Sequence, residues 1–279
     1  MEIKCWGSRG SIAVSGKDTV KYGGDTTCIE VVAKSGETII VDAGTGIRRL
    51  GKSCIKRKIK NYTLIFTHAH WDHILGFAFF RPLLYSWATV NIQDRKFADI
   101  RTKDVLCEVM KEPFFPIGLG GLNANITFDK GLNGKFDIGS IRVEPIPTSH
   151  PGGGFGYKFT EDGRSFVFLT DNELGFDHPG GAGFDGYVDF CREAEVLFHD
   201  GEYTEEEYRR RKMWGHSAIT HVADLAVKAG VKRLGIIHLN QDRTDDQIDQ
   251  MIAQCRAGLK QQNPAIDCFA VGTDLTLTL

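Results

Sequence analysis

The stretch TLIFTHAHWDHILGF, residues 63–77, joins an apolar strand-like run to a cluster of metal-binding side chains. Within six consecutive positions it carries His68, His70, Asp72 and His73. Side chains two apart in an extended chain point the same way, so His68 and His70 can reach one ion together. Asp72 and His73 lie where the chain turns into a helix, and they can hold a second ion. Two imidazoles do not complete the four-ligand shell that zinc prefers, so the pattern predicts further ligands elsewhere in the chain.

Three more candidate ligands close apolar runs later in the sequence. His150 ends VEPIPTSH, Asp171 ends FVFLTD and His238 ends RLGIIH, and each precedes a glycine-rich or polar turn. Ligands at the ends of several strands sit on a rigid scaffold, which a preorganised metal site needs. Asp42 ends TIIVD in the same manner. We expect Asp42 to accept a hydrogen bond from a ligand histidine and so to orient that ring.

Length and composition are those of an ordinary globular protein. The 279 residues are 42% hydrophobic and 25% charged. No low-complexity linker or short repeat interrupts them, so we expect one domain over residues 1–279. No run of about 18 uncharged apolar residues occurs, and the N-terminal segment lacks the pattern of a signal peptide. The sequence therefore predicts neither a membrane span nor an exported protein.

Cysteine usage and charge indicate the compartment and the kind of partner. The seven cysteines form no C-x-x-C pair, which indicates reduced thiols in the cytoplasm rather than a thiolate zinc site. The net charge of −2 gives no global attraction for nucleic acid, and the locally basic run Lys56–Lys60 is typical of solvated surface. We expect a small-molecule substrate, no membrane partner and, by default among assemblies, a homodimer.

The hydrophobic pattern predicts two groups of strands, with helices concentrated towards the end of the chain. Apolar runs bounded by glycine or polar turns predict strands at Ile3–Trp6, Thr27–Ala33, Thr38–Asp42, Thr63–Thr67, Phe136–Ile146, Gly156–Thr160, Phe166–Thr170, Val196–His199 and Leu234–His238. A helix is expected over Phe97–Lys111, two helices frame the last strand, and Thr244 can cap the second of these. These elements predict an α/β fold of two sheets packed face to face and covered by helices.

The histidine cluster resembles the H-x-H-x-D-H motif of the metallo-β-lactamase superfamily, and the likeness extends across nearly the whole chain. The resemblance implies an αββα four-layer sandwich of two mixed sheets. It also implies two divalent metal ions, with zinc expected and manganese or iron as alternatives. By this likeness one ion is held by His68, His70 and His150, the other by Asp72, His73 and His238, and Asp171 bridges both.

Within that superfamily the chain resembles the ribonuclease Z and cyclic-nucleotide phosphodiesterase branch. LFHDGEY looks like the branch's His-Glu-Ala-Thr segment, with Asp200 in place of the glutamate. WGHSAIT looks like its His-Ser-Thr segment, which makes His216 the proton-relay histidine. The resemblance thus implies a catalytic set of His216, Asp200 and Asp72, with Asp200 orienting His216. Ribonuclease Z carries a long arm that grips transfer RNA, and we find no flexible basic insertion of that kind in this sequence.

The resemblance implies a dinuclear metal hydrolase that attacks a small or cyclic nucleotide-type phosphodiester through a metal-bridging hydroxide. An ester, lactone or amide hydrolase with the same metals is the first alternative. An iron-dependent oxygenase or redox protein of this fold is the second, and a non-catalytic binding module is the third. Intact Asp72 and His73 favour two hydrolytic metals, and the complete ligand set disfavours a binding module.

For several other polar and aromatic residues, the sequence suggests a structural role or leaves a structural and a functional role open. We expect His199 to form hydrogen bonds inside the sandwich, His221 to lie in the first turn of a helix, and His178 to be exposed. Arg9 either contacts a substrate phosphate or holds a turn. Residues Phe114–Pro116 form either an apolar lid over a ring or part of the core.

Overall fold

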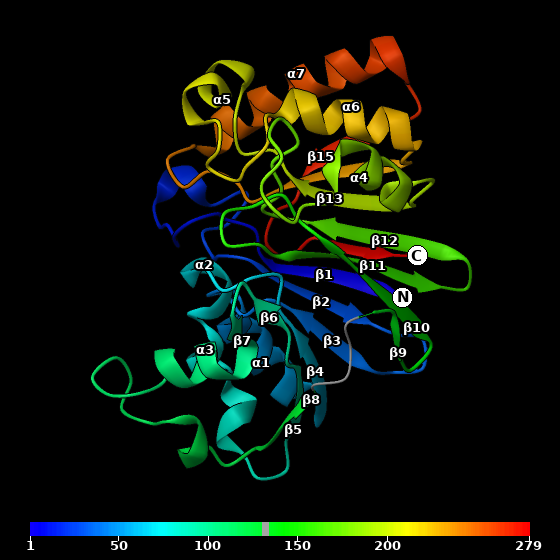
Figure 1. Cartoon of the computed structure of the whole chain (residues 1–279). Helices are drawn as coiled ribbons and strands as arrows, with labels where there is room; N and C mark the ends of the chain where they lie inside the picture. The colour runs from blue at the N-terminus through cyan, green and yellow to red at the C-terminus, as the bar shows by residue number, and fades with distance from the viewer. Residues whose placement is uncertain (130–133) are drawn as a thin grey trace.

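The computed structural model describes residues 1–129 and 134–279, in which two seven-stranded sheets pack face to face with helices on their outer sides (Figure 1). The first sheet has the strand order β16-β1-β2-β3-β4-β5-β8. Its strands are β1 (Glu2–Gly7), β2 (Cys28–Val32), β3 (Thr38–Val41), β4 (Asn61–Ile65), β5 (Thr89–Gln93), β8 (Asn125–Asp129) and β16 (Thr276–Thr278). Strands β3, β4, β5 and β8 pair in parallel, so their carboxyl ends meet at one edge of the sheet.

The second sheet has the order β15-β14-β13-β12-β11-β10-β9. Its strands are β9 (Phe136–Ile138), β10 (Ile141–Pro147), β11 (Phe155–Glu161), β12 (Arg164–Leu169), β13 (Val196–Asp200), β14 (Arg233–Ile237) and β15 (Asp267–Ala270). Strands β12 to β15 are parallel, whereas β9 to β12 form antiparallel pairs. Both sheets are therefore mixed, and the predicted αββα sandwich is confirmed.

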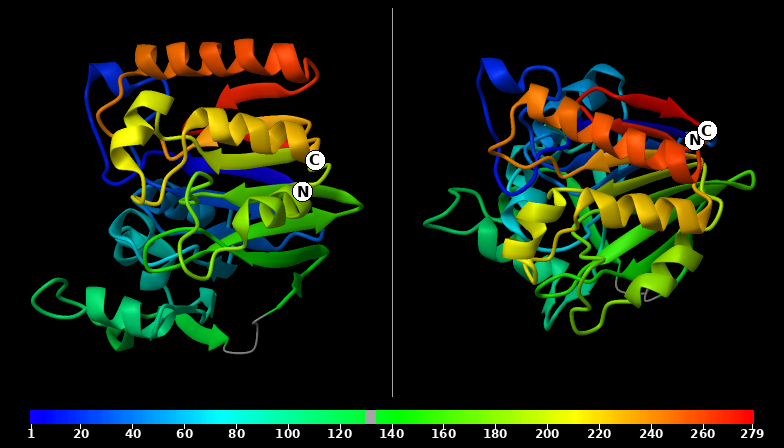
Figure 2. Two further views of the ribbon diagram at one scale, coloured as in Figure 1. Left: turned by 45° about the horizontal axis from the view of Figure 1, so that its top comes forward. Right: turned by 90° about the horizontal axis from the view of Figure 1, so that it is seen from above.

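Helices occupy both outer layers. They are α1 (Ile47–Lys56), α2 (Trp71–Ile74), α3 (Thr102–Val109), α4 (Gly183–Cys191), α5 (Glu205–Arg211), α6 (Ile219–Ala229) and α7 (Asp245–Gln262). Short 3-10 turns are η1 (Lys17–Thr19), η2 (Phe77–Phe79), η3 (Arg81–Leu84) and η4 (Leu119–Gly121), and β6 (Lys96–Phe97) with β7 (Ile100–Arg101) forms a small hairpin. Figure 2 shows α6 and α7 lying along the outer face of the second sheet.

Three hydrophobic clusters hold these layers together. One lies between the two sheets and includes Ile39, Val143 and Phe166. A second packs α4, α6 and α7 on the second sheet, and a third packs α1 and the η2–η3 region on the first sheet. Each sheet buries apolar side chains on both faces, against the other sheet on one face and against helices on the other. Burial of this apolar surface stabilises the sandwich and fixes the positions of the sheet edges relative to each other.

Most predicted strand boundaries lie within two residues of the observed ones, but two predicted elements differ more from the structure. The helix expected over Phe97–Lys111 is only Thr102–Val109, because the β6–β7 hairpin precedes it and the Thr102 amide donates to the Arg95 carbonyl oxygen at 2.8 Å. The strand expected over Phe136–Ile146 is divided into β9 and β10. Gly139 has a φ of 56° in the turn between them, a conformation that glycine adopts without steric cost.

The helix predicted after Thr244 is confirmed as α7. The Thr244 hydroxyl accepts from the Gln247 amide at 3.3 Å, and the Gln247 side chain accepts from the Thr244 amide at 2.9 Å. This reciprocal cap satisfies amides that the first helical turn leaves unpaired. All seven cysteines are free thiols, and over the described residues no helix is long and apolar enough to cross a membrane.

Candidate metal centre

The seven predicted ligands lie together where strands of both sheets end. His68 and His70 follow β4, Asp72 and His73 lie in α2, and His150, Asp171 and His238 follow β10, β12 and β14. Residues separated by more than a hundred positions in the sequence thus meet at one edge of the sandwich. The structure brings all seven together in two overlapping groups, each with its ligand atoms within 4.8 Å of one another.

Backbone conformation at this edge is unusual for residues with side chains. Asp42, Asp171 and His238 have φ values of 62°, 52° and 57°, in the left-handed region. Such conformations cost of order 1 kcal/mol or more for a residue other than glycine, and they concentrate at functional sites. Here each one turns the chain sharply at a strand end, which aims the side chain towards the shared edge.

The first group consists of His68, His70, His150 and Asp171. His150 Nε2 lies 3.1 Å from His70 Nδ1. Asp171 Oδ2 lies 3.5 Å from His68 Nε2 and 3.9 Å from His150 Nε2. Three imidazole nitrogens and one carboxylate oxygen are a donor set that zinc and similar divalent ions accept in tetrahedral sites.

The second group consists of Asp72, His73, His238 and again Asp171. His73 Nε2 lies 3.2 Å from Asp72 Oδ2 and 3.3 Å from Asp171 Oδ1. His238 Nε2 lies 3.2 Å from Asp72 Oδ2 and 3.4 Å from Asp171 Oδ2. Asp171 therefore contacts both groups, as a carboxylate that bridges two ions must.

Unpaired buried atoms test whether these residues fit metal ions. His68 Nε2 and His73 Nε2 are buried and have no hydrogen-bond partner. A buried polar atom without a partner carries a penalty of about 1–3 kcal/mol, so native structures rarely retain one without a reason. Both nitrogens point at the shared carboxylate, and coordination of a divalent ion would satisfy them. The residues present fit two such ions.

Three of the candidate ligand rings are oriented by hydrogen bonds from Nδ1, the ring nitrogen that faces away from the metal groups. His73 Nδ1 donates to Asp42 Oδ2 at 2.8 Å, His150 Nδ1 donates to the Gly215 carbonyl oxygen at 2.9 Å, and His238 Nδ1 donates to Glu202 Oε2 at 2.9 Å. Each bond fixes the ring so that Nε2 faces the centre. The orienting role predicted for Asp42 is confirmed.

The electrostatics of the site favour bound cations. Burial alone would raise the pKa of Asp171, but His238, His73 and His68 hold it well below its usual value. Burial lowers the pKa of His68 well below its usual value and that of His150 to about 4. The carboxylate is therefore ionised and these two imidazoles are neutral near neutral pH, which are the states that bind metals.

His216 lies against the metal groups, but its carboxylate partner differs from the prediction. Its Nδ1 lies 3.6 Å from Glu202 Oε2 and 4.0 Å from Asp171 Oδ2, and its ring stacks on His238 with centroids 4.6 Å apart. Asp200 instead accepts from the backbone amides of Asn172 and Ser217 at 2.7 and 2.8 Å. The expectation that Asp200 orients His216 is wrong.

The physical reason lies in where β13 ends. Asp200 is the last residue of that strand, and its carboxylate holds two loop amides inside the protein. Burial and the neighbouring Asp171 raise the pKa of Asp200 well above its usual value, so it is also a poor anionic partner. Glu202, two residues further on, reaches both His216 and His238. Its place within the same HDGEY segment is the signal that could have found it.

Glu173 is a second buried carboxylate that sequence reasoning missed. It accepts hydrogen bonds from the amides of Met213 and Gly215, both at 2.8 Å, and from the Tyr208 hydroxyl at 2.7 Å. These bonds hold the loop that leads into His216. Gly215 has a φ of 91°, and a Cβ there would lie 2.2 Å from His150 Nδ1, so this position requires glycine.

The remaining polar predictions have mixed outcomes. His178 was expected to be exposed, but it is largely buried because its Nε2 donates to Glu173 at 2.9 Å. His199 is buried and donates through Nδ1 to the Asp200 carbonyl oxygen at 2.7 Å, and His221 lies in the first turn of α6, both as predicted. Arg9 is buried and donates to the carbonyl oxygens of residues 23, 240 and 243 at 2.9, 3.1 and 2.9 Å, so its role is structural.

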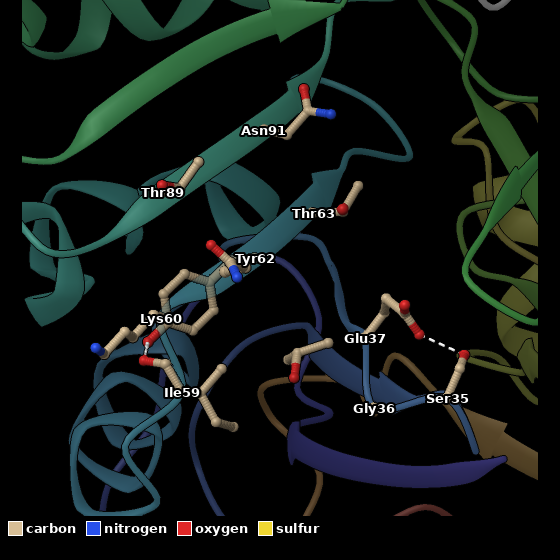
Figure 3. A pocket seen from close by; sticks show the side chains of 11 residues that line it. Ser35, Gly36, Glu37, Ile59, Lys60, Tyr62, Thr63, Thr89 and Asn91 are labelled. Carbon is tan, nitrogen blue, oxygen red and sulfur yellow. Dashed lines mark hydrogen bonds between the residues drawn. The ribbon is translucent and has the colours of Figure 1, made fainter.

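A polar hollow elsewhere on the first sheet is separate from the metal centre (Figure 3). It has a volume of about 520 Å³ and lies at the amino ends of β3, β4 and β5, where Glu37, Lys60 and Asn91 line it. His68 and His70 follow the opposite, carboxyl end of β4. The hollow therefore takes no part in the metal site.

These features define a metal-binding αββα sandwich. The model of the family described as "Beta-lactamase superfamily domain" matches residues 37–239, and the chain belongs to this superfamily. A ribonuclease Z of Gemmatimonas aurantiaca is 24% identical in an alignment 268 positions long, and the match covers 78% of this chain and 81% of that protein. This relationship places the chain near the ribonuclease Z branch, among metal-dependent hydrolases.

Solved structures share the same fold. The metallo-beta-lactamase fold protein YhfI from Bacillus subtilis superposes with a TM-score of 0.72 at 15% identity, covering 99% of this chain and 98% of that one. A diphosphatase from the PhnP family superposes with a TM-score of 0.67 at 20% identity, covering 100% and 97%. At these identities the likeness shows the fold and leaves the substrate to be argued from the site.

Proposed function

We propose that this chain hydrolyses a small phosphodiester with the help of two divalent metal ions, of which zinc is our first choice. The observation that carries the proposal is the position of His216 beside two ligand groups that share Asp171. Bound divalent ions would supply Lewis acidity that activates a water molecule and neutralises charge on phosphoryl oxygens. Hydrolysis then adds water across one P–O ester bond and yields an alcohol and a phosphomonoester.

The chain's own residues would hold the ions, orient the ligands and deliver a proton. His68, His70 and His150 would bind one ion, Asp72, His73 and His238 the other, and Asp171 both. His216 would give a proton to the leaving ester oxygen, a step that typically contributes about a hundredfold or more. Burial lowers the pKa of His216 below its usual value, and the Glu202 carboxylate, 3.6 Å from His216 Nδ1, opposes that shift by favouring the protonated imidazole that this step needs.

Three considerations support a small diester as substrate. Ribonuclease Z cleaves phosphodiester bonds, and the diphosphatase of the PhnP family also acts on phosphoryl groups. The net charge of −2 provides no general attraction for a long polyanion such as RNA. The segment that projects after α3 is also largely apolar, with Lys111 balanced by Glu108.

A substrate panel tests the proposal. Zinc- or manganese-loaded protein is assayed with bis(p-nitrophenyl) phosphate, p-nitrophenyl phosphate, p-nitrophenyl acetate and a lactone. We expect the diester to be turned over best, and His216→Ala to retain both metals but to lose about a hundredfold in turnover. Faster hydrolysis of the carboxylic ester or lactone by the doubly loaded protein would overturn the phosphodiester assignment in favour of acyl chemistry.

A further inference from the structure

An apolar cavity of about 460 Å³ is lined in part by α2, the helix that carries Asp72 and His73, and we call it the aromatic groove. One wall comes from α2 and η2 and presents Trp71, Leu75 and Phe79. The other wall comes from the end of α3 and the following turn and presents Val109, Phe114 and Phe115. The volume lies within the range of pockets that bind small molecules, which are mostly apolar with few polar groups.

The exposure of its aromatic side chains is unusual. Trp71 and Phe114 are each 74% exposed. Core packing, the structural alternative considered for the phenylalanine pair, therefore does not account for Phe114. Large aromatic side chains presented together to solvent mark a binding surface more often than an isolated exposed apolar residue does.

The walls of the groove are held in place by the protein. Phe115 packs edge-to-face on Phe79, with ring centroids 5.9 Å apart and an interplanar angle of 82°. The amides of Phe114 and Phe115 donate to the Lys111 carbonyl oxygen at 2.9 and 3.0 Å. Phe115 also packs against the hydrophobic cluster of the first sheet, so the exposed Phe114 ring is carried by an anchored turn.

The groove and the metal centre share helix α2, which exposes Trp71 on the groove side and buries the ligands Asp72 and His73. Trp71 stands between the ligands His70 and Asp72, so its Cα lies about 3.8 Å from that of each. His70 is itself exposed, and the site therefore opens to solvent on the side where Trp71 lies. A substrate whose phosphorus lies at the metals would have a substituent within reach of this groove.

The charge of the lining selects the kind of substituent. Among the described residues that line the groove, Glu108 is the one charged side chain, and it pairs with Lys111. The lining therefore supplies no cation that could bind a phosphate. A neutral planar ring instead can stack on Trp71 and Phe114 and bury apolar area.

We propose that the aromatic groove binds an aromatic ring on the ester group that the product phosphomonoester retains, while the phosphoryl group lies at the metal centre and the leaving ester oxygen faces His216. The ring is either a nucleobase or a plain aryl group, since both present the same stacking face. This inference rests on the proposed phosphodiester hydrolysis and specifies the substrate class further. It assigns Trp71 and Phe114 as residues that determine specificity.

Three p-nitrophenyl phosphodiesters test the proposal because they share a leaving group and differ in the second ester: methyl, phenyl or thymidine-5′. We expect kcat/KM to be roughly tenfold or more higher for at least one ring-bearing diester than for the methyl diester. In Phe114→Ala this ratio should fall towards one, while the methyl diester changes by less than about twofold. Val20→Ala is the control, because Val20 is 75% exposed and lies outside the groove. A thymidine preference would identify a nucleobase, and a phenyl preference a plain aryl group.

Binding of two phosphonates separates failure of the groove from failure of the proposed activity. Phenylphosphonate and methylphosphonate carry P–C bonds that resist hydrolysis, and calorimetry measures their affinity for the zinc-loaded protein. Tighter binding of phenylphosphonate that is lost in Phe114→Ala would support the groove even if no diester is turned over. Turnover with an aryl preference unchanged in Phe114→Ala would overturn the groove and leave the activity intact. A dimer that dissociates in Phe114→Ala would assign the surface to a second copy and also overturn the proposal.

Discussion

Replacing Asp42 by asparagine tests whether a buried carboxylate sets the affinity of the second metal group. Asp42 Oδ2 accepts from His73 Nδ1 at 2.8 Å, and the Thr67 amide donates to Oδ1 at 2.7 Å. Asparagine keeps the shape and tolerates the left-handed φ of 62°, so the backbone should persist. It removes the charge that fixes the His73 ring.

The expected size of the effect follows from that one bond. A hydrogen bond to a charged group contributes about 1.5–3 kcal/mol, which corresponds to roughly 10- to 100-fold in a binding constant. Loss of a partner that orients a metal-binding histidine typically has the same cost in metal affinity. We therefore expect the Asp42→Asn variant to bind one of its two zinc ions roughly 10- to 100-fold more weakly than the wild-type protein does. The affinity for the other ion should change less.

Competition with a chromophoric chelator measures both zinc affinities, and thermal unfolding of the metal-free protein controls for stability. Asp94→Asn is the matched variant, because Asp94 is also buried and follows β5 of the same sheet, where it accepts from the Lys103 amide at 3.0 Å. It should lower the melting temperature without changing zinc affinity. Wild-type affinity for both ions in Asp42→Asn would refute the assigned role.

Four further substitutions address the proton donor and its surroundings. His216→Ala should keep both metals and lower kcat about a hundredfold, so loss of metal in this variant would make His216 a ligand instead. Glu202→Gln should lower kcat roughly tenfold or more, whereas Asp200→Asn should mainly cost about 1–3 kcal/mol of unfolding free energy; equal kinetic effects would restore the pairing of Asp200 with His216. Glu173→Gln replaces a carboxylate that accepts several hydrogen bonds by an amide, whose NH2 group can only donate. We therefore expect kcat to fall while zinc content stays at the wild-type level. An unchanged kcat would show that the loop before His216 keeps its position without this carboxylate.

The gathering of the seven candidate ligands could be predicted from the sequence because most of them carry local signals. His68, His70, Asp72 and His73 are contiguous, and Asp171 closes an apolar run in the way a strand-end ligand does. The strands predicted around them have the expected places, since runs of buried apolar residues between glycine turns have few other solutions. That the ligand-bearing strand ends of both sheets lie at one edge depends on how the sheets pack, and we could predict it only from the family resemblance.

The sequence did not show which carboxylates contact His216 and His178. These contacts depend on the residue at which a strand or loop ends. Asp200 and Glu202 are two acidic residues in one short segment, and the end of β13 decides which of them reaches His216. His178 follows a glycine-rich pattern typical of exposed loops, yet the distant carboxylate of Glu173 draws it inward. Contacts of this kind join segments that are far apart in the chain, so periodicity and turn signals contain no information about them.

The central claim is that two metal ions held by the groups sharing Asp171 are needed for phosphodiester hydrolysis. The most direct measurement adds zinc stepwise to metal-free protein and follows bound metal and bis(p-nitrophenyl) phosphate hydrolysis in the same samples. We predict that turnover develops mainly with binding of the second ion, up to about two equivalents per chain. Full turnover at about one equivalent, or no turnover with both sites filled, would contradict it.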